Sequence, residues 1–147
     1  MIVSISQPTL FPWLGYFDII KKSDIFVFLD TVKFEKRSWQ MRNKLKMITS
    51  EEEKEIWIRI PTKIKNTNTA IKNVLIDNSQ KWENQHIATF QNIYGNESKE
   101  IKFLFELYQK KWEKLSDFNI EFIKNCCKFL EINTPLYLAS ELDVSGK

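Results

Sequence analysis

Two side chains of this 147-residue chain are candidates for moving a proton, His86 and Asp30. His86 is the one histidine present. Imidazole has the unperturbed pKa nearest neutrality, so it suits a general base that activates an amine. Its position beside Trp82 and Phe90 on an apolar stripe fits a packing role as well. Asp30 can accept a proton or bind a sugar hydroxyl, and it can equally be a turn residue or a partner of Lys33.

A second group of side chains is suited to holding a ligand. The Gln7 amide precedes a proline and can orient a hydroxyl or amine, or form a turn hydrogen bond. Arg42 carries a planar, permanently charged guanidinium, and Asn43 carries an amide. Together they suit the binding of a diphosphate or carboxylate, although both also fit a solvated strand face. Because neighbouring strand residues point to opposite faces, the two share one ligand only at a bulge or strand end. Arg42 is therefore the stronger candidate.

Charge and aromatic rings near these residues extend the candidate site. Lys33 and Arg37 belong to a basic cluster that an acidic run at 51–55 follows and partly cancels. The net charge is only +3, so a small phosphate-bearing ligand fits this pattern better than a nucleic-acid duplex. Tyr16 and Trp39 can stack on a sugar or a base, or they can be ordinary core aromatics.

The first elements must position these groups. Residues 2–6 alternate and residues 25–29 are continuously apolar, which predicts two strands, with a helix between them that starts near Pro12. Open α/β sheets bind ligands outside the carboxyl ends of parallel strands, where Gln7 and Asp30 fall. The sequence therefore predicts a concave basic pocket that these two residues share with Arg42 and His86.

The rest of the chain adds strands and then helices. Further strands are predicted over 39–47, 56–60 and 71–76. Apolar spacing predicts three helices: one with Ser79 as N-cap and Gly95 as C-cap, one over 101–112, and one over 120–130 with Ser116 as cap. A short strand follows at 136–139. The fold class is α/β, with α+β as the alternative: a strand-rich N-terminal part with a three- to four-stranded sheet, then three helices and the short strand.

Composition limits the classes of protein. With only 3 Gly and 4 Pro, the chain has no linker-like stretch, and we expect one domain over residues 1–147. Cys126 and Cys127 are adjacent in a helical pattern, cannot bridge each other, and are expected to be reduced, and no metal-ligand spacing occurs. No signal peptide or membrane span is recognisable, so the expected location is the cytoplasm.

Several spaced motifs resemble the WbqC-like family: QPTLFPWLGYF at 7–17, DIFVFLD at 24–30, RSWQMRN at 37–43, the later pattern of Trp82, His86 and Tyr94, and the closing Thr134-Pro135 and Ser140-Glu141-Leu142. The resemblance covers essentially the whole chain. It implies a relation to bacterial surface-polysaccharide (O-antigen) and amino-sugar pathways, and a transferase that attaches glycine or another acyl group to an amino sugar. Family members are longer, so the resemblance also implies a domain that is truncated at its C-terminal end.

The leading hypothesis is a transferase that modifies a nucleotide-linked amino sugar. In it, His86 or Asp30 is the base, and Arg42 and Lys33 bind the phosphates of a nucleotide sugar or coenzyme A thioester. The alternative is a non-catalytic binding or assembly protein of the same pathway. A nucleic-acid module is a third reading, prompted by basic residues interleaved with Phe34 and Trp39. The sequence identifies no cofactor.

Overall fold

A computed structural model describes residues 1–48, 52–64, 66, 68–95 and 102–142 of the chain. Its central feature is a parallel sheet of three strands in the order β1-β2-β7, formed by β1 (Val3–Ser6), β2 (Ile25–Phe28) and β7 (Leu136–Leu138). Val3 pairs with Ile25 and Phe26 with Leu136. The parallel pairing of β1 and β2 places Gln7 and Asp30 beyond the carboxyl ends of neighbouring strands, as the sequence indicates.

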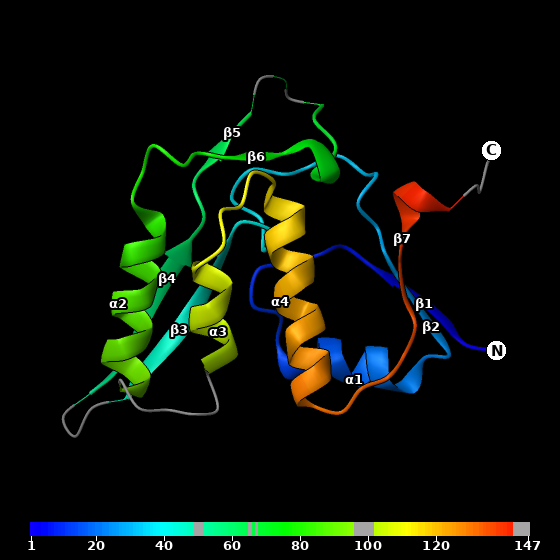
Figure 1. The fold of residues 1–147 in the computed structure, drawn as a ribbon, viewed down its shortest axis with the longest axis horizontal. Helices are drawn as coiled ribbons and strands as arrows, with labels where there is room; N and C mark the ends of the chain where they lie inside the picture. Colours follow the sequence, from blue (N-terminus) through cyan, green and yellow to red (C-terminus); the bar gives the residue numbers. More distant parts are fainter. Residues whose placement is uncertain (49–51, 65, 67, 96–101, 143–147) are drawn as a thin grey trace.

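Helices α1 (Leu14–Lys22) and α4 (Leu115–Phe129) cover one face of this sheet (Figure 1). Phe26 and Phe28 point to that face and are almost completely buried. They form a core with buried residues of both helices and with the segment before β7: Tyr16, Phe17, Ile20, Ile120, Ile123, Cys127 and Ile132. The helix expected from near Pro12 begins two residues later, at Leu14, and ends at Lys22.

The opposite face of the parallel sheet is apolar. The side chains of Val3, Ile5 and Tyr137 remain 46%, 60% and 45% exposed, whereas Ser4 and Ser6 alternate with them and point towards the helices. Ser4 accepts a hydrogen bond of 2.6 Å from Ser23, the C-cap residue of α1. The polar side of β1 therefore faces the helices and its apolar side faces outward.

The remaining strands do not join this sheet. Strands β3 (Arg42–Ile48) and β4 (Glu53–Arg59) form an antiparallel ribbon, and β5 (Thr62–Lys63) pairs with β6 (Leu75–Ile76). The three- to four-stranded sheet expected in the N-terminal part is thus divided, because the third strand of the parallel sheet is the distant β7. Within the 71–76 segment, only Leu75–Ile76 is strand, preceded by a 3-10 turn at Ile71–Asn73.

The second half contains the three predicted helices, α2 (Trp82–Tyr94), α3 (Lys102–Tyr108) and α4. Helix α2 packs on β3, α3 packs against both α2 and α4, and α4 lies between these helices and the parallel sheet (Figure 1). A 3-10 turn at Ala139–Glu141 follows β7. The larger core lies between the ribbon and these helices, and Phe122 packs against both this core and the one under the parallel sheet.

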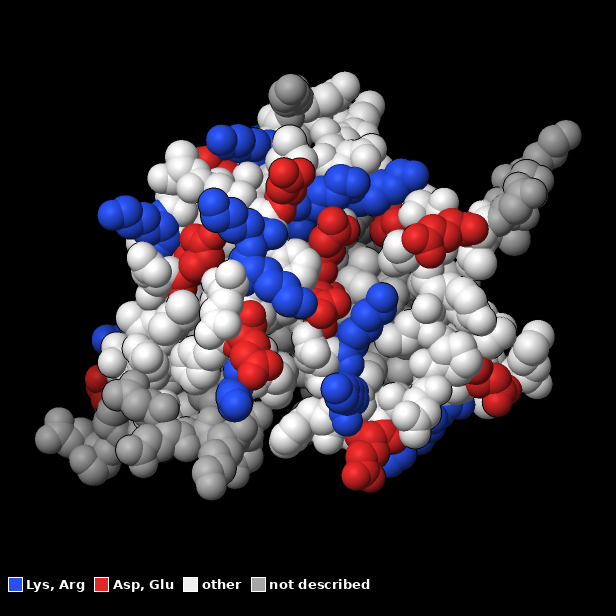
Figure 2. All heavy atoms as spheres, viewed as in Figure 1, with Lys and Arg blue, Asp and Glu red and all other residues white. Residues whose placement is uncertain are grey.

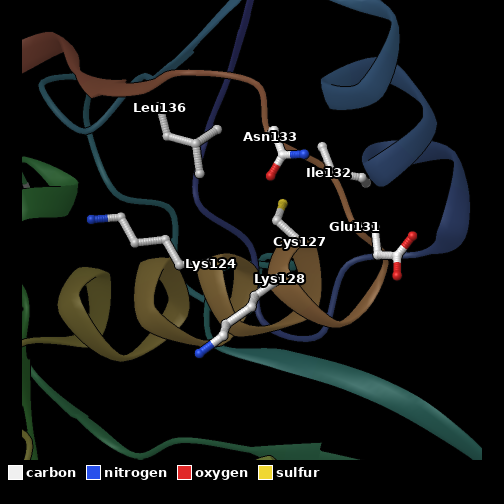
Figure 3. Close-up of a pocket in the computed structure, with 7 residues that line it drawn as sticks. All are labelled: Lys124, Cys127, Lys128, Glu131, Ile132, Asn133 and Leu136. Carbon is white, nitrogen blue, oxygen red and sulfur yellow. The ribbon is translucent and has the colours of Figure 1, made fainter.

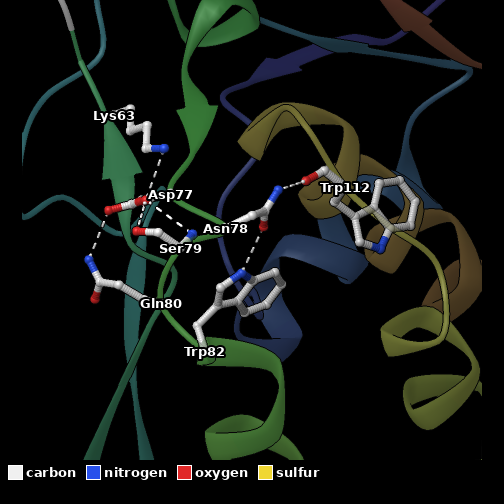
Figure 4. Close-up of polar contacts among 7 residues, drawn as sticks. All are labelled: Lys63, Asp77, Asn78, Ser79, Gln80, Trp82 and Trp112. Atoms are coloured by element: carbon white, nitrogen blue, oxygen red, sulfur yellow. Dashed lines mark hydrogen bonds and ion pairs between the residues drawn. The ribbon is translucent and has the colours of Figure 1, made fainter.

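The start of α2 differs from the sequence expectation. Gly95 ends the helix with a φ of 78°, as predicted, but Ser79 does not cap it. Ser79 instead donates through its hydroxyl to Asp77, which Gln80 and Lys63 also contact (Figure 4). A hydrogen bond of 3.1 Å from the Trp82 indole to the Asn78 side chain then fixes the first turn. Ser116 likewise lies inside the first turn of α4, with Lys114 as N-cap.

Within the described residues, no helix is long and apolar enough to cross a membrane. The face of the molecule drawn in Figure 2 carries Lys and Arg side chains interleaved with Asp and Glu. That face therefore has no continuous basic surface of the kind that nucleic-acid binding requires.

Candidate functional site

The loop between β1 and α1 is held in a backbone conformation that few residues adopt. Phe11 has a φ of 48°, in the left-handed region that favours glycine. The Asn43 side-chain amide donates to the carbonyls of Leu10 and Phe11, at 2.9 and 2.7 Å. The backbone N–H of Leu10 donates to the carbonyl of Trp39 at 2.8 Å. A strained residue persists only where its surroundings over-determine it, and such residues concentrate at functional sites.

Hydrogen bonds among the side-chain amides of Gln7, Gln40 and Asn119 also hold this loop. Gln40 donates to the Gln7 side-chain oxygen at 2.6 Å. Asn119 of α4 donates to the carbonyls of Pro8 and Gln40, at 3.2 and 2.8 Å. Gln40 and Asn119 are 3% and 1% exposed, and each keeps one side-chain oxygen without a partner among the described residues. The amide of Gln7 is thus used within the protein to fix the loop.

A pocket of about 420 Å³ opens at the carboxyl end of β1, and we call it the aromatic pocket. Its lining consists of Ser6, Thr9, Pro12, Trp13, Tyr16, Trp39 and Asn43. Three of these, Tyr16, Trp39 and Asn43, are residues that the sequence indicates as ligand-binding candidates. They reach the pocket from three separate parts of the chain: α1, the turn before β3, and β3 itself.

Trp13 forms one wall of the aromatic pocket and is 74% exposed. Its indole ring lies directly over Gly15, where a Cβ atom would stand 1.9 Å from the ring. The absence of a side chain at residue 15 therefore allows this position of the ring.

Tyr16 is a buried residue in the lining of the pocket. Its O–H donates to the carbonyl of Gln7 at 3.0 Å. Burial raises the pKa of the Tyr16 phenol far above its usual value, and a hydrogen bond with Ser6 offsets only part of this effect. Tyr16 therefore remains protonated at neutral pH.

Trp39 connects the aromatic pocket to the outer face of the β3–β4 ribbon. Its ring stacks on that of Trp57, with centroids 6.1 Å apart and an interplanar angle of 23°. The Arg42 guanidinium lies 4.5 Å from the centre of the Trp57 ring, and the Lys44 ammonium lies 5.2 Å from it. Arg42 thus lies beside the pocket and points to the face opposite Asn43, as strand alternation predicts. Trp57 was not among the residues that the sequence suggested as ligand-binding. Its position at the centre of a strand of charged residues could have indicated an exposed ring available for stacking.

His86 lies in the core between α2 and the ribbon, 3% exposed. Its Nε2 lies 2.8 Å from the carbonyl oxygen of Arg59, and its Nδ1 lies 2.8 Å from the hydroxyl of Tyr108. A carbonyl can only accept, so Nε2–H donates and Nδ1 accepts from Tyr108. Burial lowers the pKa of His86 to about 4, and the bond to Arg59 opposes this only in part. The ring is thus neutral and fully hydrogen-bonded.

Asp30 is 2% exposed and has its own partners. Its two carboxylate oxygens accept from the backbone N–H of Ser140 at 2.9 Å and from the Ser140 hydroxyl at 2.6 Å. The backbone carbonyl of Asp30 accepts from Lys72 N–H. The carboxylate thus fastens the turn after β7 to the end of β2.

The four residues expected around one basic pocket therefore have different surroundings. Gln7 contacts Gln40, Arg42 contacts Trp57, Asp30 contacts Ser140, and His86 contacts Tyr108 and Arg59. The reason is that the ribbon bearing Arg42 leaves the parallel sheet instead of extending it.

The two remaining basic candidates lie along the turns that precede the ribbon. Lys33 forms an isolated antiparallel bridge with Ala70 and lines a hollow with Phe34 and Lys36. Arg37 has a φ of 63° and lines a neighbouring hollow. Neither residue lines the aromatic pocket.

A further hollow of about 510 Å³ lies between the end of α4 and the segment that leads into β7. The Cys127 sulfur points into it, and Lys124, Lys128 and Asn133 lie around it (Figure 3). Burial raises the pKa of Cys127 to about 11, so its thiol stays protonated and is a poor nucleophile. Neither cysteine is bonded to another. Among the described residues, no group of three or more His, Cys, Asp or Glu side chains is arranged to hold a metal ion.

Fold and site together define an α/β protein with a ligand-sized aromatic pocket at the carboxyl edge of a parallel sheet. The chain belongs to the WbqC-like protein family, which it matches over residues 7–147. It is 30% identical over 139 residues to the uncharacterized protein Rv1507c of Mycobacterium tuberculosis. That match covers 91% of this chain and 58% of the relative, so the chain spans little more than half the length of that protein. No solved structure matches the chain significantly.

Proposed function

We propose that this WbqC-like protein is a transferase of bacterial surface-polysaccharide (O-antigen) or amino-sugar biosynthesis, which attaches glycine or another acyl group to a nucleotide-linked amino sugar. The aromatic pocket carries the proposal. Its indole and phenol rings can stack on the apolar faces of a sugar, while the hydroxyls of Ser6 and Thr9 can bond to sugar hydroxyls. The resemblance of the sequence to a family of these pathways supports the same substrate class.

The reaction would form an amide bond. The amine nitrogen of the sugar attacks the carbonyl carbon of an activated acyl donor, the bond to the donor's leaving group breaks, and the nitrogen loses a proton. Of the described residues that line the pocket, only Tyr16 is titratable, and it stays protonated. The pocket would therefore contribute mainly by holding amine and donor in position, an effect that can be large.

His86 and Asp30, the two candidates for a catalytic base, fit positioning roles better. His86 is neutral, and both its nitrogens are engaged by Arg59 and Tyr108. Asp30 uses both carboxylate oxygens on Ser140. We propose that His86 positions the ribbon and Asp30 positions the turn after β7.

The same observation favours a second candidate function, a protein that binds the nucleotide sugar without changing it. Such a protein needs the aromatic pocket but no base. Formation of an acylated sugar distinguishes the transferase from the binding protein, whereas binding of the nucleotide sugar is expected of both.

The test measures binding of nucleotide amino sugars by calorimetry, followed by mass spectrometry of mixtures that also contain a glycyl or acyl thioester. Trp39→Ala is expected to weaken binding by about 1–3 kcal/mol, the usual cost of losing one stacked ring. Phe129→Ala is the matched control, because Phe129 and Trp39 are both 56% exposed and Phe129 lies far along α4. Equal weakening in both variants, or no binding at all, would contradict the site. Binding without an acylated product would favour the non-catalytic function.

A further inference from the structure

Three cationic side chains surround a separate hollow of about 280 Å³ at one end of the β3–β4 ribbon. Lys36 and Arg37 come from the turn before β3, and Arg59 is the last residue of β4. Thr62 and Gln80 add a hydroxyl and an amide to the lining. Among the residues that the structure describes, no acidic side chain lines the hollow.

The cations of this hollow differ from those further along the ribbon in their ion pairing. Within the part of the chain that the structure describes, Lys36, Arg37 and Arg59 form no ion pair. Further along the ribbon, by contrast, the lysines do form ion pairs: Lys44 pairs with Glu55 and Lys46 pairs with Glu53. The ribbon is thus charge-balanced along most of its length and cationic at the end where β4 stops.

Two acidic side chains lie near the lining residues: Glu35 lines the neighbouring hollow together with Lys36, and Asp77 accepts a hydrogen bond from Gln80. The Asp77 carboxylate also accepts from Ser79 and pairs with Lys63 at 3.2 Å. These contacts, first the one from Ser79, hold the pKa of Asp77 well below its usual value. The Asp77 carboxylate is therefore engaged by Ser79, Gln80 and Lys63.

The backbone on both sides of the hollow is fixed. Arg37 occupies the left-handed region with a φ of 63°, which is uncommon for a residue with a side chain. The carbonyl of Arg59 accepts the hydrogen bond from His86 at 2.8 Å, and Ile60 N–H donates to the carbonyl of Met41 at 2.8 Å. The two arginines therefore extend from anchored positions, as in a pre-organised binding site.

A series of side-chain neighbours leads from the hollow to the aromatic pocket along the outer face of the ribbon. Arg59 pairs with Arg42 in the strand register. Arg42 lies over Trp57, which stacks on Trp39 at the pocket wall. A single extended ligand can therefore contact rings at one end of this surface and cations at the other.

We propose that the hollow formed by Lys36, Arg37 and Arg59 binds the diphosphate of the substrate. The assignment rests on the proposed function, in which the sugar occupies the aromatic pocket. Arginine presents a planar fork of donors that matches phosphate oxygens in pairs, and a diphosphate supplies enough negative charge for three cations. Nucleotide sugars and coenzyme A both carry this group, and the experiment separates them.

The first test uses inorganic pyrophosphate and calorimetry at low and high salt. Pyrophosphate is expected to bind, more weakly as salt screens the charges. Arg59→Gln is expected to lower the affinity roughly tenfold, the usual effect of losing one charge-assisted contact. Arg37→Gly removes the second charge and leaves a residue that favours the same backbone, so a similar loss is expected. Lys54→Gln, which removes one charge at the other end of β4, should change the affinity less than twofold.

The proposal is overturned if pyrophosphate does not bind, or if Lys54→Gln reduces binding as much as Arg59→Gln. Melting curves of each variant serve to check that the fold is retained. Competition of pyrophosphate with a nucleoside diphosphate and with coenzyme A then identifies the source of the diphosphate. Binding of pyrophosphate that depends on Arg59, without any binding of an amino-sugar nucleotide, would uphold the anion site and contradict the proposed function. If the nucleotide sugar binds and Arg59→Gln leaves its affinity unchanged, the proposed function is upheld and the anion site is contradicted.

Discussion

The side-chain amide of Asn43 donates a hydrogen bond of 2.7 Å to the carbonyl of Phe11, a residue held at a φ of 48°. The Phe11 ring points inward and meets Phe122 edge to face, with centroids 4.7 Å apart. One side of the loop is thus fixed by an amide from the ribbon and the other by aromatic packing. This arrangement joins the ribbon to the parallel sheet and shapes the pocket between them.

Replacement of Asn43 by Ala is expected to destabilise the fold by about 1–3 kcal/mol. The variant leaves the carbonyls of Leu10 and Phe11 without their donor, and the strained conformation of Phe11 loses its support. Urea unfolding measures the change. Asn125→Ala is the control, because the Asn125 amide donates to the carbonyl of Glu121 within its own helix and not to the loop. A loss in Asn43→Ala no larger than in the control would show that the amide does not hold the loop.

The single histidine predicts a specific dependence of stability on pH. Burial lowers the pKa of folded His86 from 6.5 to about 4, so between these values the unfolded chain binds a proton that the folded chain does not. By linkage, the free energy of unfolding falls as the pH is lowered from about 6.5 to about 4, by an amount on the order of 3 kcal/mol. Above about 6.5 the contribution of His86 is constant.

Urea unfolding of the native chain and of His86→Gln, at several pH values across this window, isolates the effect. Because no other histidine is present, the difference between the two curves should shrink as the pH falls. A constant difference would mean that His86 titrates normally in the folded protein and is accessible to protons, as a catalytic base would be.

The carboxyl-edge arrangement could be predicted because its signals are local. The apolar run of β2 ends at Asp30, the alternation of β1 ends at Gln7, and the single helix between them requires a parallel pair. The separation of the ribbon could not be predicted, because β2 takes its second neighbour from residues 136–138, more than 100 positions away. Sequence patterns contain no direct information on such distant pairings.

The site shows the same limit. Tyr16, Trp39 and Asn43 attracted attention through residue type alone, and the structure places all three around one pocket. His86 attracted attention for its chemistry, but its partners Arg59 and Tyr108 are 27 and 22 residues away, and only the folded chain shows that both its nitrogens are engaged. The alternative reading of His86 as a packing residue rested on its apolar stripe and agrees with its burial.

The outward apolar side of β1 leads to a prediction about stability. Ile5→Thr is expected to change the free energy of unfolding by less than about 0.5 kcal/mol, because Ile5 is 60% exposed and Thr is compatible with a strand. Phe28→Ala, on the opposite face and 1% exposed, is expected to cost about 3–5 kcal/mol. Urea unfolding compares the two. A large loss for Ile5→Thr would show that this face is covered in solution.

Gly15→Ala separates the stability of the fold from the shape of the aromatic pocket. Alanine favours the helix by about 1 kcal/mol over glycine, but its Cβ would stand 1.9 Å from the Trp13 ring. The ring is 74% exposed and free to swing outward, so the fold should be retained while the pocket loses a wall. The melting temperature should thus stay the same or rise, while calorimetry should show weaker binding of a nucleotide amino sugar.

Gly95→Ala is the converse control. The φ of 78° at Gly95 disfavours alanine, so this variant should lower the melting temperature and leave binding unchanged. Undiminished ligand affinity in Gly15→Ala would mean that Trp13 does not contact the ligand.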